Sequence, residues 1–174
     1  MRVIGLDPGL RRTGWGVIDA DGAVLAHVAN GCCRSVGSSL GERLASLFEQ
    51  LTEIVATYAP EEASVEKTFV NSNYGGSLTL GHARGVAILS VARMGIRIGE
   101  YAPNAVKKAV TGVGHADKIQ VEAMIQLQLP GALINGTDAA DALAVAVAHT
   151  AVRQFSNRLN DALFRAAHSS DVPA

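Results

Sequence analysis

The chain has 174 residues, of which 48% are hydrophobic and 18% charged, and its formal net charge at pH 7 is −1. Its length suits a single compact domain, because chains of this size bury roughly 70% of the surface they expose when unfolded. This composition excludes intrinsic disorder, and the apolar run 142–148 is too short to span a membrane.

The N-terminus and the cysteines give an expectation about cellular location. The chain begins without a long apolar segment or a small-residue cleavage site, so we expect a cytoplasmic protein. Cys32 and Cys33 are adjacent and are the two cysteines of the chain, which argues against a disulfide framework or a thiolate zinc site. We expect both to be reduced thiols in the core.

Charge is unevenly distributed along the chain. Residues 1–66 carry a net charge of −4, residues 67–136 carry +4 and residues 137–174 carry −1. An acidic cluster beside a basic surface suits a metal-dependent enzyme that acts on phosphates, but solvated faces of opposite sign would give the same sums. Charge by itself leaves both interpretations open.

The first third of the sequence predicts an antiparallel meander followed by a helix. Alternating apolar residues predict strands at 3–7, 14–19 and 23–34, the last two joined by the turn dipeptide Asp21-Gly22. Ser39 and Glu42 form a capping-box pattern, and apolar residues then recur at helical spacing until Pro60.

The remaining two thirds alternate between helices and strands. The expected elements are a strand at 63–66, a glycine-rich loop at 71–76, a helix at 77–94, a strand at 96–101, a short helix from Pro103, a helix at 117–129 and an alanine-rich helix from Asp138 to about Val152. Strands separated by helices are parallel neighbours, so the fold class is α/β. We expect a mixed five-stranded sheet, with three antiparallel meander strands and two parallel strands, flanked by helices.

Four acidic residues are the candidates for chemistry. Asp7 and Glu66 each end a strand of the parallel set, at the edge where ligands gather in α/β sheets. Asp138 and Asp141 lie three residues apart on one face of the last helix. A turn-forming Asp7, a solvated Glu66 and acids that complement a helix dipole are the structural alternatives.

Convergence of the four carboxylates would favour a metal site. Like charges repel, and hard oxygen ligands suit Mg²⁺ or Mn²⁺ better than zinc. Two such ions can activate a water and stabilise the leaving oxygen in a phosphoryl displacement, which is the chemistry of a nuclease.

Several segments, in their order and spacing, resemble the RuvC family of Holliday-junction resolvases. They are VIGLDPGLRRTGWGV, ASVEKTFVNSN, LGHARGVAI, YAPNAVKKAVTGVGHADK and TDAADALAVAVAH, which together extend over residues 2–150. The resemblance implies an RNase H-like fold, two Mg²⁺ ions per active site (with Mn²⁺ as a substitute) held by Asp7, Glu66, Asp138 and Asp141, and symmetric cutting of two strands to give 5′-phosphate ends. It also implies a homodimer, a four-way DNA junction as substrate and the RuvA-RuvB branch-migration complex as a partner.

The resemblance also assigns residues outside the acidic set. It implies that Lys107 and Lys118 act near the scissile phosphate and that Phe69 is a wedge stacking on unpaired bases. The expected DNA contacts, in addition to Phe69, are Lys67, Tyr74 and Arg84, with Arg11 and Arg12 as further backbone contacts. Lys108 is expected on a solvated helix face, and a place in the core is the alternative for Phe69. His82 and His149 are expected to be structural, and His115 has no assigned role.

The sequence also predicts how the chain is divided, and it leaves three rival functions open. We expect an RNase H-like nuclease domain at 1–153 and a partly disordered C-terminal tail at 154–174, with a short amphipathic helix near Leu159, Leu163 and Phe164. The rivals are an RNase H-like nuclease acting on another nucleic acid, an actin-like ATPase or sugar-kinase fragment, and a non-catalytic junction-binding module.

Overall fold

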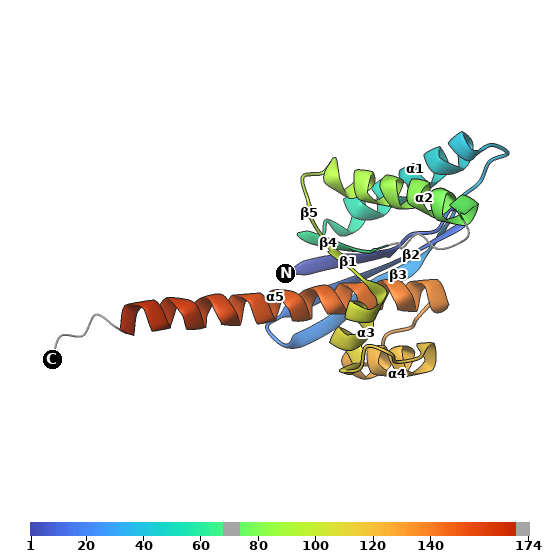
Figure 1. Ribbon diagram of the computed structural model, residues 1–174. Coiled ribbons are helices and arrows are strands. Elements are labelled where there is room, and N and C mark those ends of the chain that lie inside the picture. Colours follow the sequence, from blue (N-terminus) through green and yellow to red (C-terminus); the bar gives the residue numbers. More distant parts are fainter. Residues whose placement is uncertain (68–73, 170–174) are drawn as a thin grey trace.

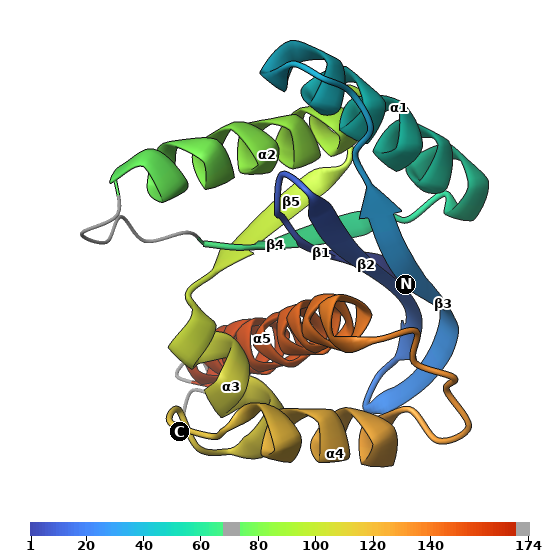
Figure 2. The ribbon, with the colours of Figure 1, turned by 90° about the vertical axis from the view of Figure 1, so that its right-hand side faces the viewer.

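The computed structural model describes residues 1–67 and 74–169, apart from the side chains of Tyr74 and of residues 166–169. In that part of the chain, a mixed β-sheet lies between two layers of helices (Figure 1, Figure 2). The α/β class expected from the sequence is confirmed.

The sheet has the mixed topology that the sequence predicted. Its described strands are β1 (Arg2–Asp7), β2 (Arg12–Asp21), β3 (Val24–Arg34), β4 (Glu62–Glu66) and β5 (Arg97–Tyr101). Their order in the sheet is β3-β2-β1-β4-β5. β1, β2 and β3 form the antiparallel meander, and β4 pairs in parallel with β1 and with β5.

Helices cover both faces of the sheet. They are α1 (Leu40–Tyr58), α2 (Tyr74–Ala92), α3 (Pro103–Thr111), α4 (Lys118–Gln128) and α5 (Thr137–Ser169). α1 and α2 cover one face, whereas α5, backed by α3 and α4, covers the other (Figure 2). Each face therefore has its own hydrophobic core.

Alternation along β1 determines which of its residues reach α5. Ile4 and Leu6 belong to the core under α1 and α2, while Val3 belongs to the core under α5. Successive side chains of a strand point to opposite faces, so Gly5 and Asp7 also face α5. The Asp7 carboxylate at the end of β1 thus points toward the helix that carries Asp138 and Asp141.

Glycines in the sheet allow the backbone of α5 to lie directly on β1 and β2. A Cβ at Gly5 would overlap with the carbonyl oxygen of Ala142, and a Cβ at Gly14 would overlap with that of Asp138. The α5 residues that pack here, from Ala139 to Ala148, are buried and mostly alanine or valine. The close approach of helix and sheet is what brings the α5 carboxylates near the strand ends.

Local sequence signals account for the N-terminal end of α1. The Ser39 hydroxyl accepts a hydrogen bond from the Glu42 backbone N–H at 3.2 Å, and the Glu42 carboxylate accepts one from the Ser39 N–H at 3.1 Å. This confirms the predicted capping box, which satisfies two N–H groups that have no partner within the helix.

Two predicted boundaries are wrong. α2 begins at Tyr74, so 74–76 are helical and not part of a loop; the Thr79 hydroxyl donates to the Gly75 carbonyl in this first turn. α5 continues to Ser169 instead of ending near Val152, because no glycine or proline interrupts 137–169. The predicted short helix near Leu159 is part of this one, which extends well beyond the sheet (Figure 1).

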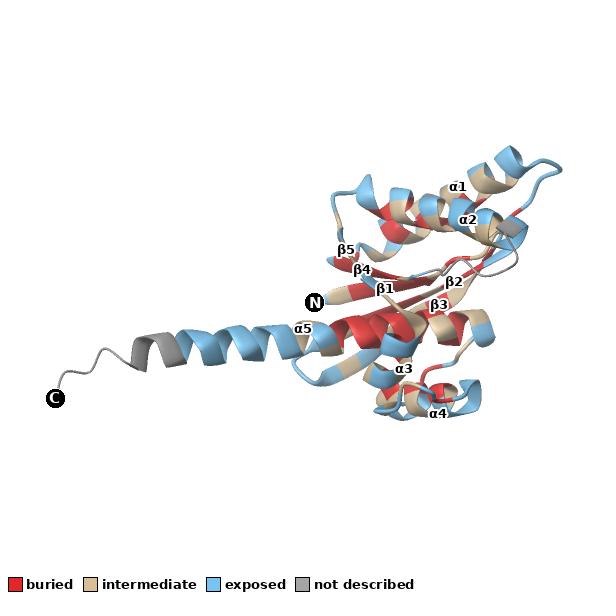
Figure 3. Cartoon of the chain, in the orientation of Figure 1, coloured by how far each residue is buried: buried red, intermediate tan, exposed pale blue. Residues whose placement is uncertain are grey.

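Burial changes along α5 although the helix does not break. Residues 139–150 are mostly buried against the sheet, and those after residue 154 are exposed as far as their side chains are described (Figure 3). The apolar-to-polar change in the sequence therefore marks where the helix leaves the sheet. The predicted tail residues 170–174 lie outside the described residues, so the division at 153/154 stays a prediction. No described helix combines the length and hydropathy needed to cross a lipid bilayer.

Substitution of Gly5 tests the contact between β1 and α5. We expect Gly5→Ala to lower the free energy of unfolding by about 3 kcal/mol, because the added methyl group must displace the α5 backbone. Gly41→Ala is the matched control, since nothing lies within 4 Å of a Cβ there and alanine favours the helix. Urea denaturation of both variants measures the difference; equal stability of the two would contradict this account of the packing.

Candidate active site

Asp7 and Glu66 emerge side by side at one edge of the sheet. β1 and β4 are parallel, and Leu6 pairs with Val65, so the next residue of each strand is one of the two acids. Val65 belongs to the core under α1 and α2, so Glu66, like Asp7, points toward α5. The predicted convergence of these two strand-end carboxylates is confirmed.

The first turns of α5 bring the second pair of acids to the same edge. Asp7 pairs in register with Gly14 of β2, and the Asp138 backbone lies over Gly14 where a side chain would otherwise be. Asp141 follows one turn later and shares a pocket with Asp7 and Glu66. Asp138 does not line that pocket, although its charge raises the pKa of Asp7.

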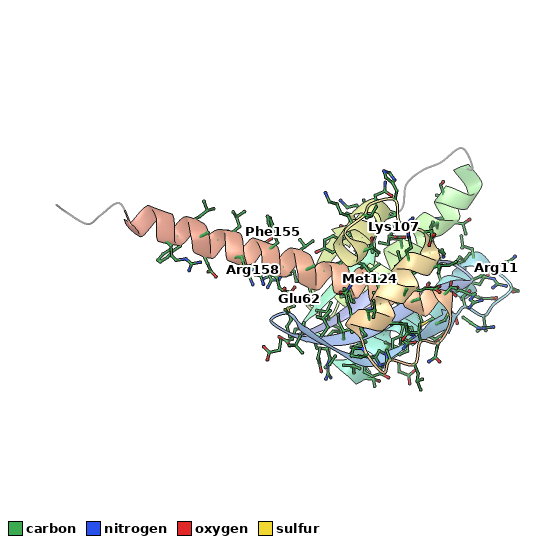
Figure 4. All side chains as sticks on the ribbon, turned by 90° about the horizontal axis from the view of Figure 1, so that it is seen from below. Arg11, Glu62, Lys107, Met124, Phe155 and Arg158 are labelled. Carbon is green, nitrogen blue, oxygen red and sulfur yellow. The ribbon has the colours of Figure 1, made fainter. Side chains whose placement is uncertain are left out.

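The pocket has a volume of about 350 Å³ and combines acidic and basic walls. Lys107 of α3 and Lys118 at the start of α4 line it together with the three acids, and Figure 4 labels Lys107 on its helix. Lys107 is half-buried, whereas its neighbour Lys108 is exposed, as the sequence predicted. The two lysines assigned to the site thus lie beside the carboxylates.

Cationic side chains hold two of the acids. The Lys118 ammonium donates a hydrogen bond to Asp141 Oδ2 at 2.8 Å. Arg12 Nε lies 2.7 Å from Asp138 Oδ2, and Cys32 Sγ lies 3.6 Å from the same oxygen. These partners orient Asp138 away from the pocket that the other three acids share.

Burial and the neighbouring acids disfavour the ionised form of Asp7. Burial, followed by the charges of Glu66, Asp141 and Asp138, raises the pKa of Asp7 to about 7, and Lys118 offsets only part of this. Burial and the Asp141 charge raise the pKa of Glu66 as well. The hydrogen bond to Asp141 raises the pKa of Lys118, which stays cationic. A carboxylate in this position is stabilised by an added positive charge.

The donor set fits a hard divalent cation. No described residue donates a hydrogen bond to the Asp7 carboxylate. A cation could therefore bind its oxygens without displacing a described hydrogen-bond donor. Within 1–67 and 74–169, however, no three His, Cys, Asp or Glu side chains form a ready metal cage. Carboxylate oxygens favour Mg²⁺ or Mn²⁺ over softer metals. Asp7, Glu66 and Asp141 would hold the ions, and Asp138 would join them on leaving Arg12.

The other predicted DNA contacts are described only in part. Phe69 lies outside the described residues, and so does the side chain of Tyr74. Lys67 is exposed just beyond the pocket. Arg84 donates from Nε to the Glu66 carbonyl at 3.3 Å and pairs with Glu100, so it supports the end of β4 from within the chain.

Some residues at or near the site have roles that the sequence did not indicate. Arg12, expected only as a DNA contact, is the partner of Asp138. Cys32, expected in the core with Cys33, is half-exposed beside them; both cysteines are free and only Cys33 is buried. Neither contact has a local sequence signal, because β2 and β3 meet α5 only in the folded chain. His82, expected to be structural, is exposed on α2.

Comparison with known proteins agrees with this geometry. A family model described as Crossover junction endodeoxyribonuclease RuvC matches residues 3–149. The chain belongs to the RuvC family. The RuvC of Ruegeria pomeroyi is 58% identical over 149 residues, which are 86% of this chain and 90% of the relative. The RuvC of Cereibacter sphaeroides is 57% identical over 167 residues, 96% of this chain and 99% of the relative.

A solved RuvC structure supports the fold assignment. T. thermophilus RuvC in complex with Holliday junction substrate matches with a TM-score of 0.84 at 26% identity, covering 90% of this chain and 96% of that one. The resemblance to the RuvC family and the RNase H-like fold are therefore confirmed. RuvC membership also decides against the actin-like ATPase or sugar-kinase alternative.

Replacing Asp7 tests the charge repulsion without any substrate. The pKa of Asp7 is about 7 in the folded protein and about 4 in an unfolded chain, so ionisation costs folding free energy progressively as pH rises from 4 to 7. We expect Asp7→Asn to be more stable than wild type by about 2 kcal/mol at pH 8 without metal, and equal to it below pH 4. Urea denaturation across this pH range measures the difference.

Divalent metal should reduce this difference in stability between the wild type and Asp7→Asn. Millimolar Mg²⁺ at pH 8 should raise the unfolding free energy of the wild type and change that of Asp7→Asn much less, because a ligand that binds the folded state stabilises it. An equal response of both proteins would remove Asp7 from the metal site.

Proposed function

We propose that this chain is a Holliday-junction resolvase, an Mg²⁺-dependent endodeoxyribonuclease that nicks two strands of a four-way DNA junction symmetrically in recombination and repair. The observation that carries the proposal is the pocket in which Asp7, Glu66 and Asp141 lie beside Lys107 and Lys118. Membership of the RuvC family supports the substrate, since one solved relative is described in complex with a Holliday junction.

The side chains of the pocket divide the work of phosphodiester hydrolysis. Two bound Mg²⁺ ions would supply an activated water and positive charge near the leaving oxygen. Asp7, Glu66, Asp138 and Asp141 would hold them. Water would add its oxygen to phosphorus as the P–O3′ bond breaks. One proton of the water passes to the 3′ oxygen, which becomes a hydroxyl, and the phosphate stays on the 5′ end.

The lysines act on the phosphate. Lys118 pairs with Asp141 and extends from the N-terminus of α4 into the pocket; Lys107 approaches from α3. Positive groups aimed at a phosphate stabilise the charge that develops on its oxygens during the reaction. We assign both lysines to this role.

A homodimer would place two such sites on one junction. α2 carries Leu78 and Leu89 as exposed apolar residues, and nothing lies within 4 Å of a Cβ at Gly81 or Gly85 between them. A second copy could approach this glycine face closely. Paired sites related by a two-fold axis would account for symmetric nicking.

The remaining assignments follow the same proposal. Phe69 would stack on bases near the crossover, with Lys67, Tyr74 and Arg84 as further DNA contacts. The RuvA-RuvB branch-migration complex is the proposed protein partner, and the cytoplasm the proposed location. Mn²⁺ would substitute for Mg²⁺, because both prefer oxygen ligands.

Cleavage of a synthetic four-way junction tests the function. We expect the wild type to cut it in Mg²⁺ and not in EDTA, to leave linear duplex intact, and to produce 5′-phosphate ends. Asp7→Asn should bind the junction normally and cut it at least about 10³-fold more slowly, because a carboxylate that would hold the metal ions is lost. Asp21→Asn, which replaces an exposed acid at the end of β2, is the matched control. Preferential cutting of RNA–DNA hybrids would favour the other RNase H-like function, and wild-type binding without cutting would favour a binding module.

The adjacent lysines of α3 allow a matched pair of variants. We expect Lys107→Ala to reduce the cleavage rate at saturating junction on the order of 10²-fold, because a charge near the scissile phosphate is removed. Lys108→Ala removes an equal charge one residue away on the exposed side and should change the rate less than about twofold. Single-turnover cleavage measures both rates; equal losses would point to general DNA attraction and not to a catalytic role.

A further inference from the structure

A buried chain of hydrogen bonds joins α5 to β4 and β5 outside the pocket. His149 of α5 is 3% exposed, and its Nδ1 lies 2.8 Å from the Tyr101 hydroxyl. Its Nε2 lies 2.6 Å from Oε2 of Glu62, which is 7% exposed and is labelled beside α5 in Figure 4. Arg153, one turn further along α5, lies 2.9 Å from the other Glu62 oxygen.

Hydrogen bonding assigns the protons of this network. Glu62 is anionic because Arg153 pairs with it and Arg97 lies 3.7 Å from the same oxygen. It therefore accepts a hydrogen bond from the Nε2–H of His149, and Nδ1 accepts one from the Tyr101 hydroxyl. Burial and the Glu62 charge raise the pKa of Tyr101, which keeps this donor protonated. Both ring nitrogens of His149 thus have a hydrogen-bonding partner.

The sheet is shaped to receive this histidine. A Cβ at Gly99 of β5 would lie 2.6 Å from His149 Nδ1, so a glycine leaves the space that the ring fills. The other α5 side chains in the interface, from Ala139 to Ala148, are mainly alanine and valine. Small apolar side chains attract without fixing direction, whereas hydrogen bonds do fix it. The His149 contacts, together with the Arg153–Glu62 pair, consequently form a directional link between α5 and the parallel strands.

The position of α5 determines where its carboxylates lie. His149 follows Asp141 by eight residues, about 12 Å along the helix axis. A slip of one residue would move Asp138 and Asp141 by about 1.5 Å and rotate them by about 100°. The same slip would remove a partner from buried Glu62, which costs free energy.

We propose that His149, held between Tyr101 and Glu62, is a positioning residue that sets the register of α5 and thereby places Asp138 and Asp141 opposite Asp7 and Glu66. This inference rests on the metal-dependent nuclease function proposed above. His149 acts through the helix and touches neither metal nor DNA. Glu62 remains paired with Arg153 when the imidazole is removed, so the fold has a way to survive the loss.

Metal affinity separates positioning from simple stabilisation. We would measure Mn²⁺ binding by titration calorimetry on the protein without DNA, and junction cleavage as a function of Mn²⁺ concentration. His149→Leu should raise the Mn²⁺ dissociation constant on the order of tenfold, as loss of a group that orients metal ligands does. Tyr101→Phe removes one oxygen atom and should raise it about threefold. Cleavage by both variants should recover at high Mn²⁺.

Val147→Ala is the matched control, because Val147 is buried in the same stretch of α5 and outside the network. It should lower the unfolding free energy and leave the Mn²⁺ dissociation constant within about twofold of wild type. Unchanged Mn²⁺ affinity in His149→Leu despite a similar loss of stability would overturn the proposal. If His149→Leu does not fold, Tyr101→Phe decides the question in the same way.

The two proposals fail in distinguishable ways. A wild-type protein that neither binds Mn²⁺ nor cuts the junction would overturn the nuclease function and this inference with it. A wild type that does both, with variants of equal Mn²⁺ affinity, would overturn the inference alone.

Discussion

Repulsion among carboxylates gathered at one edge of the sheet is the constraint on which the rest of the site depends. Asp7 and Glu66 end parallel strands and face α5, whose first turns carry Asp138 and Asp141. The repulsion is strong enough, together with burial, to raise the pKa of Asp7 to about 7. Added positive charge stabilises this cluster of carboxylates, and side chains or divalent cations can supply it.

Lys118 and Arg12 supply part of that charge in the present structure, and they do so in different ways. Lys118 holds Asp141 inside the pocket, where a phosphate would also meet the ammonium group. Arg12 holds Asp138 at the margin beside Cys32. Metal binding would therefore compete with the Arg12 pair, and the fourth carboxylate would enter the site only when that pair opens. The sheet positions Asp7 and Glu66, whereas the position of Asp138 depends on a surface arginine, Arg12.

Close packing of α5 on the sheet makes the convergence possible and also creates a need for alignment. Glycines in β1 and β2 allow the helix backbone to approach, and alanines on α5 match them. Such an interface is tight but has few features that fix register. The His149 contacts with Tyr101 and Glu62 provide direction where the same helix crosses β4 and β5. The polar network and the acidic site are thus two parts of one helix–sheet interface.

The sequence by itself determined the elements with local signals: the meander, the capped helix from Leu40, the parallel strands and the acids at their ends. It also indicated that Asp138 and Asp141 share one face of the last helix, because i, i+3 spacing has this effect whatever surrounds the helix. Tertiary structure alone decided that Arg12 and Cys32 meet Asp138 and that His149 joins Glu62 to Tyr101. These features depend on contacts between residues dozens to more than a hundred positions apart. Periodicity and capping report only on neighbours within a few residues, so such contacts leave no pattern in the sequence to read.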